Sequence, residues 1–118
     1  VANTAGEHVL AYDIGSDGSI LNRRNFAKLA GWKADEDGAW SSGADGLALD
    51  DEGRLYVASN AGIEIFDAQG QALGVIPLPK KPQNLAFAGK DKHVLYVVGR
   101  GAAYKLPLLA RGITGRAK

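Results

Sequence analysis

The side chains that could do chemistry in this sequence are carboxylates and amides placed just before short apolar runs. Asp45 precedes the run 47–49, and Gln83 and Asn84 precede the run 85–88. Oxygen atoms of these types suit a hard cation such as calcium, which takes about six to eight of them. A cation held there would polarise a carbonyl and make water easier to deprotonate. The alternative for Asp45 is a turn residue that hydrogen-bonds its own backbone, and the two amides could equally satisfy the backbone after a proline.

The sequence lacks the complete motifs of several other kinds of functional site. Residues 35–38 are acidic and end in glycine, but position twelve of a calcium loop that started there is Gly46 rather than Glu, which rejects an EF-hand. Residues 99–101 do not continue to the third glycine of a dinucleotide-binding loop. Ser41 and Ser42 lack the flanking glycines of a nucleophile elbow. The chain has no cysteine, which excludes thiol catalysis, disulfides and zinc ribbons.

Size and charge narrow the class of protein further. The 118 residues suffice for one ordinary domain, and 46% of them are hydrophobic, as in globular proteins. Fourteen Lys and Arg stand against thirteen Asp and Glu, mixed along the chain, so neither nucleic acid nor a membrane is expected as a partner. No apolar run approaches the roughly 20 residues that span a bilayer. We expect a soluble protein, cytoplasmic or periplasmic, and the sequence does not decide between these compartments.

The elements that must position the candidate side chains are short β-strands. Apolar runs recur about every ten residues between Gly, Asp and Asn, a pattern typical of an all-β fold. Gly53 and Gly70 end acidic turns, where a positive φ costs glycine little. The expected strands are residues 9–14, 46–49, 55–58, 63–66, 72–76, 85–88, 94–98 and 103–108.

Other segments are expected to lie outside these strands. Residues 26–30 fit a short helical turn, and residues 35–43 fit a polar surface loop. Trp32 and Trp40 flank that loop, and packing in a core or an interface is expected for them, with the lining of a substrate entrance as the alternative. The basic end, residues 111–118, fits a solvated tail.

The sequence repeats itself with a period near forty residues. Residues 47–49 followed by 55–57 recur as residues 85–87 followed by 95–97, and a further strand follows each time. Repeats of about 40 to 50 residues, each made of four short strands, are typical of β-propeller blades. We therefore expect an all-β partial β-propeller of about two and a half four-stranded antiparallel blades.

This blade count leaves the ring open. Most of one blade and a loop are expected in residues 1–43, a full blade in 44–79, most of the last blade in 80–112 and a tail in 113–118. Propellers close with about four to eight blades, because an open array exposes apolar faces and strand edges. The chain starts with Val1 and contains no Met. We expect it to be part of a longer propeller whose N-terminal blades are missing, or to pair with a second copy of itself.

Several stretches carry a resemblance to a known family. GADGLALDDEGRLYVAS (43–59), GIEIFDAQGQALGVIPLP (62–79) and NLAFAGKDKHVLYVV (84–98) resemble the senescence-marker-protein and gluconolactonase family, which includes luciferin-regenerating-enzyme-like proteins. The opening VLAYDIGSDGSILNRRNF (9–26) is similar to the outer strands of that family. The resemblance therefore covers nearly the whole chain.

The resemblance implies a six-bladed propeller that holds one divalent cation in its central channel and hydrolyses a sugar lactone or a related small ester. Calcium is the first choice for the cation, with zinc, magnesium or manganese as alternatives. By position, Asp45 looks like the family's metal-ligating aspartate, which can also act as the base. Gln83 and Asn84 stand at the corresponding strand start of the next blade, where an amide could reach the substrate. The family has Pro at the position of Ala44 and Gly-Gly at 88–89, and these departures leave the substrate open.

These patterns together predict the C-terminal portion of a divalent-metal-dependent lactone hydrolase of the gluconolactonase type. Asp45 is the expected catalytic and metal-binding residue, with Gln83 and Asn84 at the substrate. The chain alone is expected to be inactive, because one carboxylate does not hold such an ion well. The alternative is a non-catalytic propeller that serves as a scaffold or binding module, since propeller folds host unrelated functions.

Overall fold

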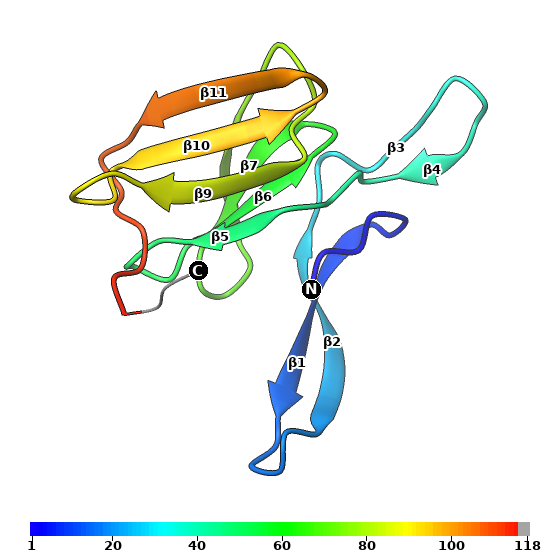
Figure 1. Ribbon diagram of the computed structural model, residues 1–118. Coiled ribbons are helices and arrows are strands. Elements are labelled where there is room, and N and C mark those ends of the chain that lie inside the picture. The colour runs from blue at the N-terminus through cyan, green and yellow to red at the C-terminus, as the bar shows by residue number, and fades with distance from the viewer. Residues whose placement is uncertain (116–118) are drawn as a thin grey trace.

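The chain folds into four small antiparallel sheets. The computed structural model describes residues 1–115, and this range contains eleven strands and no helix (Figure 1). The all-β expectation is confirmed. A search of the described residues for a helix long and apolar enough to cross a bilayer found none. The last three residues of the expected tail, 116–118, lie outside the described residues.

The middle sheet is a meander of four strands, each paired with the next. It contains β5 (Leu47–Leu49), β6 (Leu55–Ser59), β7 (Gly62–Phe66) and β8 (Ala72–Ile76). Leu47 pairs with Val57, and Tyr56 pairs with Ile65. The turns after β5 and β7 contain Gly53 and Gly70, whose φ angles are 78° and 84°, as the sequence predicts.

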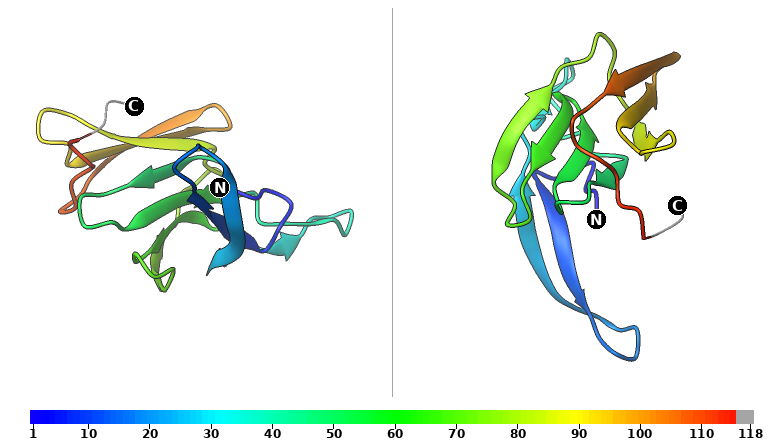
Figure 2. Two further views of the ribbon diagram at one scale, coloured as in Figure 1. Left: turned by 90° about the horizontal axis from the view of Figure 1, so that it is seen from below. Right: turned by 90° about the vertical axis from the view of Figure 1, so that its left-hand side faces the viewer.

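Three further sheets surround the middle one. One orders β9 (Asn84–Ala88), β10 (Val94–Gly99) and β11 (Ala102–Pro107) with β10 at its centre. The long hairpin of β1 (His8–Ile14) and β2 (Ile20–Lys28) projects from the body (Figure 2), and β3 (Lys33–Ala34) pairs with β4 (Trp40–Ser41) in a short arm. Each of the eight expected strands is present, with both of its ends within one residue of the expected bounds.

The helical turn expected at residues 26–30 is wrong. The chain continues as β2 through Lys28, and Ala27 pairs with Val9 of β1. Ala27 and Leu29 are buried while Lys28 between them is exposed. This two-residue alternation belongs to a strand. Pairing with β1 therefore overrides the helical spacing of the local sequence.

The central strands of the middle sheet, β6 and β7, are buried on both faces. Val57 of β6 packs in a cluster with Val9 and Phe66, under the β1–β2 hairpin. Its neighbour Tyr56 packs in a second cluster with Leu95 of the β9–β11 sheet. Successive side chains of a strand point to opposite faces, so β6 contributes to both clusters. The middle sheet thereby joins the hairpin to the β9–β11 sheet.

Replacing Leu95 by Ala should lower the free energy of unfolding by about 2–5 kcal/mol, because the side chain is 0% exposed and its removal leaves a cavity. Urea unfolding followed by circular dichroism measures the change. Leu73→Ala on β8 is the matched control: Leu73 is 55% exposed, and its loss should change the free energy by less than about 0.5 kcal/mol. Equal effects of the two substitutions would contradict the placement of this core.

Candidate functional site

The inner strands of two neighbouring sheets begin at the same end of the molecule. Asp45 lies just before β5, and Gln83 and Asn84 lie at the start of β9. The two strands run side by side in the same direction (Figure 1). The backbone N–H of Gly46 donates to the carbonyl oxygen of Gln83 at 2.8 Å. The structure therefore brings the three candidate residues of the sequence to one edge.

Asp45 has an exposed carboxylate that none of the described residues binds through a hydrogen bond or an ion pair. Asp35, Asp50 and Asp67 behave differently, since each accepts the backbone N–H groups two and four positions ahead. That local contact is what the turn interpretation requires, and Asp45 does not make it. Its backbone is fixed instead, through an N–H that donates to the carbonyl oxygen of Ala58 at 3.0 Å.

Gln83 and Asn84 are both exposed, and the side-chain oxygen of each accepts one backbone N–H. The side-chain Oε1 of Gln83 accepts the N–H of Arg100 at 3.1 Å, so this amide holds the turn between β10 and β11. Asn84 is exposed, and its Oδ1 accepts the N–H of Leu85 at 2.9 Å. Both amides therefore face solvent at this edge as Asp45 does, each with its NH2 group free of hydrogen-bond partners among the described residues.

The loop that leads into Asp45 is held from two sides. The hydroxyl of Thr4 donates to the carbonyl oxygen of Ala44 at 2.7 Å, and the N–H of Asn60 donates to that of Ser42 at 2.9 Å. Gly43 has a φ of 63°, and a Cβ there would lie 2.2 Å from Oδ1 of Asn60. Glycine is therefore required for both conformation and space. The carboxylate of Asp45 follows a loop with little freedom to move.

Glu64 is a buried carboxylate that the sequence analysis did not single out. It accepts the N–H groups of Ala30 and Gly31 at 2.7 and 3.0 Å and the hydroxyl of Ser59. A charge buried in this way is stable only when it is paired or hydrogen-bonded. The signal was present as a single Glu inside an otherwise apolar strand. Because its oxygens are occupied, Glu64 serves to fasten the β2–β3 connection to the middle sheet.

The tryptophan pair lies on the β3–β4 arm. The ring centroids of Trp32 and Trp40 are 5.5 Å apart, with a tilt of 36° between the planes. Trp40 is 57% exposed, so it does not pack in a core of the described residues, and the other half of the expectation, packing in an interface, stays a prediction. The side-chain N–H groups of Asn60 donate to the carbonyl oxygens of Gly31 and Ser41, which fixes the two ends of the arm.

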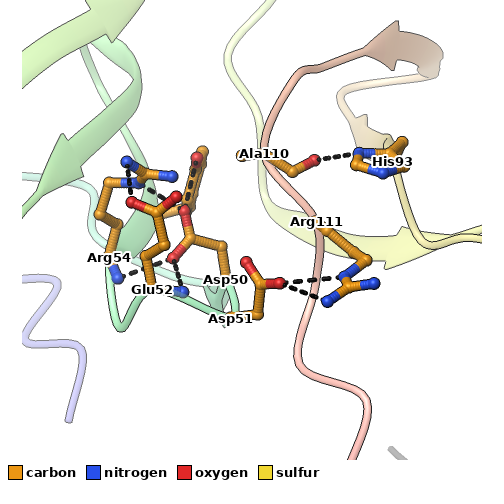
Figure 3. A network of polar contacts seen from close by, with 8 residues as sticks. Asp50, Asp51, Glu52, Arg54, His93, Ala110 and Arg111 are labelled. Atoms are coloured by element: carbon orange, nitrogen blue, oxygen red, sulfur yellow. Dashed lines mark hydrogen bonds and ion pairs between the residues drawn. The ribbon is translucent and has the colours of Figure 1, made fainter.

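The tail expected at residues 111–118 is wrong for its first residues. The carbonyl oxygen of Arg111 accepts the N–H of Asp51 at 2.8 Å, and its guanidinium contacts the Asp51 carboxylate at 2.9 Å (Figure 3). The N–H of Gly112 donates to the carbonyl oxygen of Lys92 at 3.0 Å. The segment therefore joins the turn after β5 to the turn after β9, at the end opposite Asp45. Backbone hydrogen bonds therefore hold these first residues in place, although the basic composition of the segment predicted a solvated tail.

Asp50 is a second buried carboxylate, next to this segment (Figure 3). Its Oδ2 accepts the Nε–H of Arg54 at 2.6 Å and the hydroxyl of Tyr56 at 3.2 Å. Burial raises the pKa of the Asp50 carboxyl, but hydrogen bonds from the Arg54 side chain and from the N–H groups of Arg54 and Glu52 outweigh it, and the pKa lies below 3.8. Burial and the charge of Asp50 raise the pKa of Tyr56. This cluster stabilises the turn and leaves no free oxygen for chemistry.

The donor set at the Asp45 edge is compatible with part of a cation site. Asp45 offers carboxylate oxygens, which suit calcium rather than a thiophilic metal, whereas the amide oxygen of Asn84 already accepts the N–H of Leu85. Within residues 1–115 no three His, Cys, Asp or Glu side chains gather into a metal-binding group. One carboxylate is fewer than the ligand set that a hard cation needs, so the described residues alone do not complete such a site.

Antiparallel meanders whose inner strands lie side by side define the β-propeller class of folds. The family described as the SMP-30/Gluconolactonase/LRE-like region matches residues 1–100. The chain belongs to this family, and the resemblance seen in its sequence is confirmed.

Similar proteins support the fold and the lactonase relationship. The lactonohydrolase oryH of Aspergillus oryzae is 30% identical over 105 residues, which are 88% of this chain and 20% of that protein. A gluconolactonase structure from Xanthomonas campestris is 28% identical, with a TM-score of 0.65, over 86% of this chain and 30% of its own.

Two further structures share the fold. A putative gluconolactonase is 20% identical with a TM-score of 0.80, over 97% of this chain and 36% of its own. A luciferin-regenerating enzyme is 21% identical with a TM-score of 0.74, over 95% of this chain and 42% of its own. The partial propeller expected from the sequence is confirmed. The chain spans between 20% and 42% of the length of these relatives.

Asp50→Asn should lower the free energy of unfolding by about 1.5–3 kcal/mol at pH 7, because the charged hydrogen bond from Arg54 is lost. The pKa of Asp50 is lower in the folded state than in the unfolded state. The charged carboxylate therefore adds its full share to the free energy of unfolding at pH values well above 3.8, and this share is lost as the pH falls through the folded-state pKa. The difference between wild type and variant should therefore shrink in acid. Urea titrations at several pH values measure it.

Asp67→Asn is the control for this experiment. Asp67 sits in a similar turn, but its Oδ1 accepts only backbone N–H groups, and an asparagine retains that oxygen. Its effect on the free energy of unfolding should stay within about 0.5 kcal/mol at every pH. If the decrease in the free energy of unfolding caused by Asp50→Asn were equally large in acid, the assigned role of the Asp50 charge would be contradicted.

Proposed function

We propose that this chain forms part of a divalent-metal-dependent hydrolase that opens sugar lactones. The observation that carries the proposal is the exposed carboxylate of Asp45, which has no hydrogen-bond or ion-pair partner among the described residues and lies where the neighbouring strands β5 and β9 begin, in a chain of the gluconolactonase family. The lactonohydrolase and gluconolactonase relatives support a lactone as the substrate class. Calcium is the preferred cation, because the donors at this edge are oxygen atoms.

In this proposal Asp45 is both a metal ligand and the base. A divalent cation held by the Asp45 carboxylate and by ligands from other blades would supply positive charge to polarise the lactone carbonyl. The Asp45 carboxylate accepts a proton from the water that attacks the carbonyl carbon. The ring C–O bond then breaks, the ring oxygen takes up a proton, and a hydroxy acid leaves. Asn84 lies beside Asp45 and offers an amide for the hydroxyl groups of the sugar.

We also propose that further blades of the same propeller cover the two open sides of this chain. Tyr96 and Val98, on the outer face of β10, are 42% and 49% exposed. On the other side, an apolar groove of about 730 Å³ opens between the β1–β2 hairpin and β5, lined by Leu10 and Leu47 among others. The middle and β9–β11 sheets show how such faces pack together in this fold. The remaining blades would bring the missing metal ligands.

Asp45→Asn, made in a protein that contains the complete propeller, should lower the rate of lactone hydrolysis by about 10²–10⁴-fold, because a base in the transition state contributes that much. Calcium affinity, measured by calorimetry, should fall as well. Asp67→Asn is the matched control at the opposite end of the middle sheet and should leave both unchanged. Full activity of Asp45→Asn would refute the assigned role, and a complete propeller with neither calcium binding nor hydrolysis would instead support a non-catalytic scaffold.

The chain by itself should self-associate at micromolar concentration, since its uncovered blade faces are apolar. Light scattering measures the mass in solution. Val98→Lys should weaken the association because it places a charge on the outer face of β10. Leu109→Lys is the control, since Leu109 is fully exposed outside the strands. A stable wild-type monomer would count against the proposed coverage of these faces.

A further inference from the structure

Gly46 and Gln83 form the backbone contact between the two inner strands at the Asp45 end. The N–H of Gly46 donates to the carbonyl oxygen of Gln83 at 2.8 Å. Gly46 follows Asp45 directly, so the distance between the strand starts is set one residue away from the candidate carboxylate. Any shift of this contact moves Asp45 relative to the neighbouring blade.

The close approach requires a glycine at position 46. A Cβ on Gly46 would lie 2.4 Å from Oδ1 of Asn84, 2.7 Å from Cα of Asn84 and 3.0 Å from the carbonyl oxygen of Gln83. The last two are backbone atoms and cannot rotate away. Gly46 is not among the glycines with positive φ. Space between the strands, rather than an unusual backbone conformation, is therefore the reason for this glycine.

Gln83 is itself held by the β9–β11 sheet. Its N–H donates to the carbonyl oxygen of Val98 at 2.8 Å, and its Oε1 accepts the N–H of Arg100 at 3.1 Å. On the far side of the contact, the carbonyl oxygen of Gly46 accepts the N–H of Ala58 at 3.0 Å. A continuous line of hydrogen bonds thus crosses both sheets at the end that carries the candidate site.

We infer that Gly46 and Gln83 are positioning residues of the proposed metal site, because their contact fixes where the Asp45 carboxylate lies against the next blade. The inference rests on the proposed function. Calcium binds oxygen ligands at about 2.3–2.6 Å. If the start of β5 shifts, the Asp45 carboxylate no longer lies within this distance of a cation that is also bound by ligands from the other blades. This role rests on the backbone of Gln83 and on its Oε1, and the substrate contact expected from the sequence stays a separate prediction.

Gly46→Ala in the full-length protein tests the inference. Calcium affinity, measured by calorimetry, should fall about 10–100-fold, the usual effect of changing a residue that orients a metal ligand, while circular dichroism shows the native fold. Gly74→Ala on β8 is the matched control, because a Cβ there has nothing within 4 Å, and its calcium affinity should equal that of the wild type.

Gln83→Met provides a second, milder variant. It keeps the length of the side chain and removes the acceptor for Arg100, so calcium affinity should fall by less than in Gly46→Ala. If the Gly46→Ala protein does not fold, the calcium affinity of Gln83→Met is the measurement that tests the inference. Wild-type calcium affinity in a folded Gly46→Ala protein, or in Gln83→Met when it is the deciding variant, overturns the inference and leaves the lactonase proposal intact. A wild-type protein without calcium binding or hydrolysis overturns the proposed function and the inference with it.

Discussion

The close contact between the starts of β5 and β9 is the constraint on which the candidate site depends. At that end Gly46 bonds directly to Gln83, and at the opposite end the C-terminal segment joins the same two sheets through Arg111 and Asp51. Between these ends the sheets bury an apolar cluster that includes Leu95. Interiors packed in this way resist sliding, so the strand starts keep one arrangement. The carboxylate of Asp45 is thereby carried on a rigid frame, as a ligand for a cation must be.

The carboxylates of this chain fall into two groups, those that stabilise the fold and one that is available for chemistry. Asp50 and Glu64 are buried, and each accepts several hydrogen bonds that tie turns and connections to the middle sheet. Asp35 and Asp67 close turns by accepting backbone N–H groups. Asp45 does neither, although its backbone is firmly fixed. A carboxylate that is held in place without internal partners is available for an external one, and this contrast is the structural basis of the proposed metal and base role.

In the proposed function the Asp45 edge supplies only part of the site, because the described blades do not close a ring. The matched relatives are longer than this chain, which covers 20% to 42% of them. Both sides of the described blades leave apolar surface uncovered, at Val98 on one side and in the groove beside Leu47 on the other. Closure of the propeller would cover these surfaces and bring further oxygen ligands to Asp45 at the same time. Stability and metal binding are therefore expected to depend on the same assembly step.

The sequence by itself determined the strands, the acidic turns with Gly53 and Gly70, the forty-residue repeat and the family, because these follow from local side-chain alternation, glycine conformation and a motif around Asp45. It did not determine that β2 extends through Lys28, that residues 111–113 pair with other turns, that Trp40 is exposed or that Gln83 is engaged by Arg100. These outcomes depend on contacts between segments far apart in the chain. Local patterns carry no record of which distant hydrogen-bonding groups a segment will meet, so only the tertiary structure decided them.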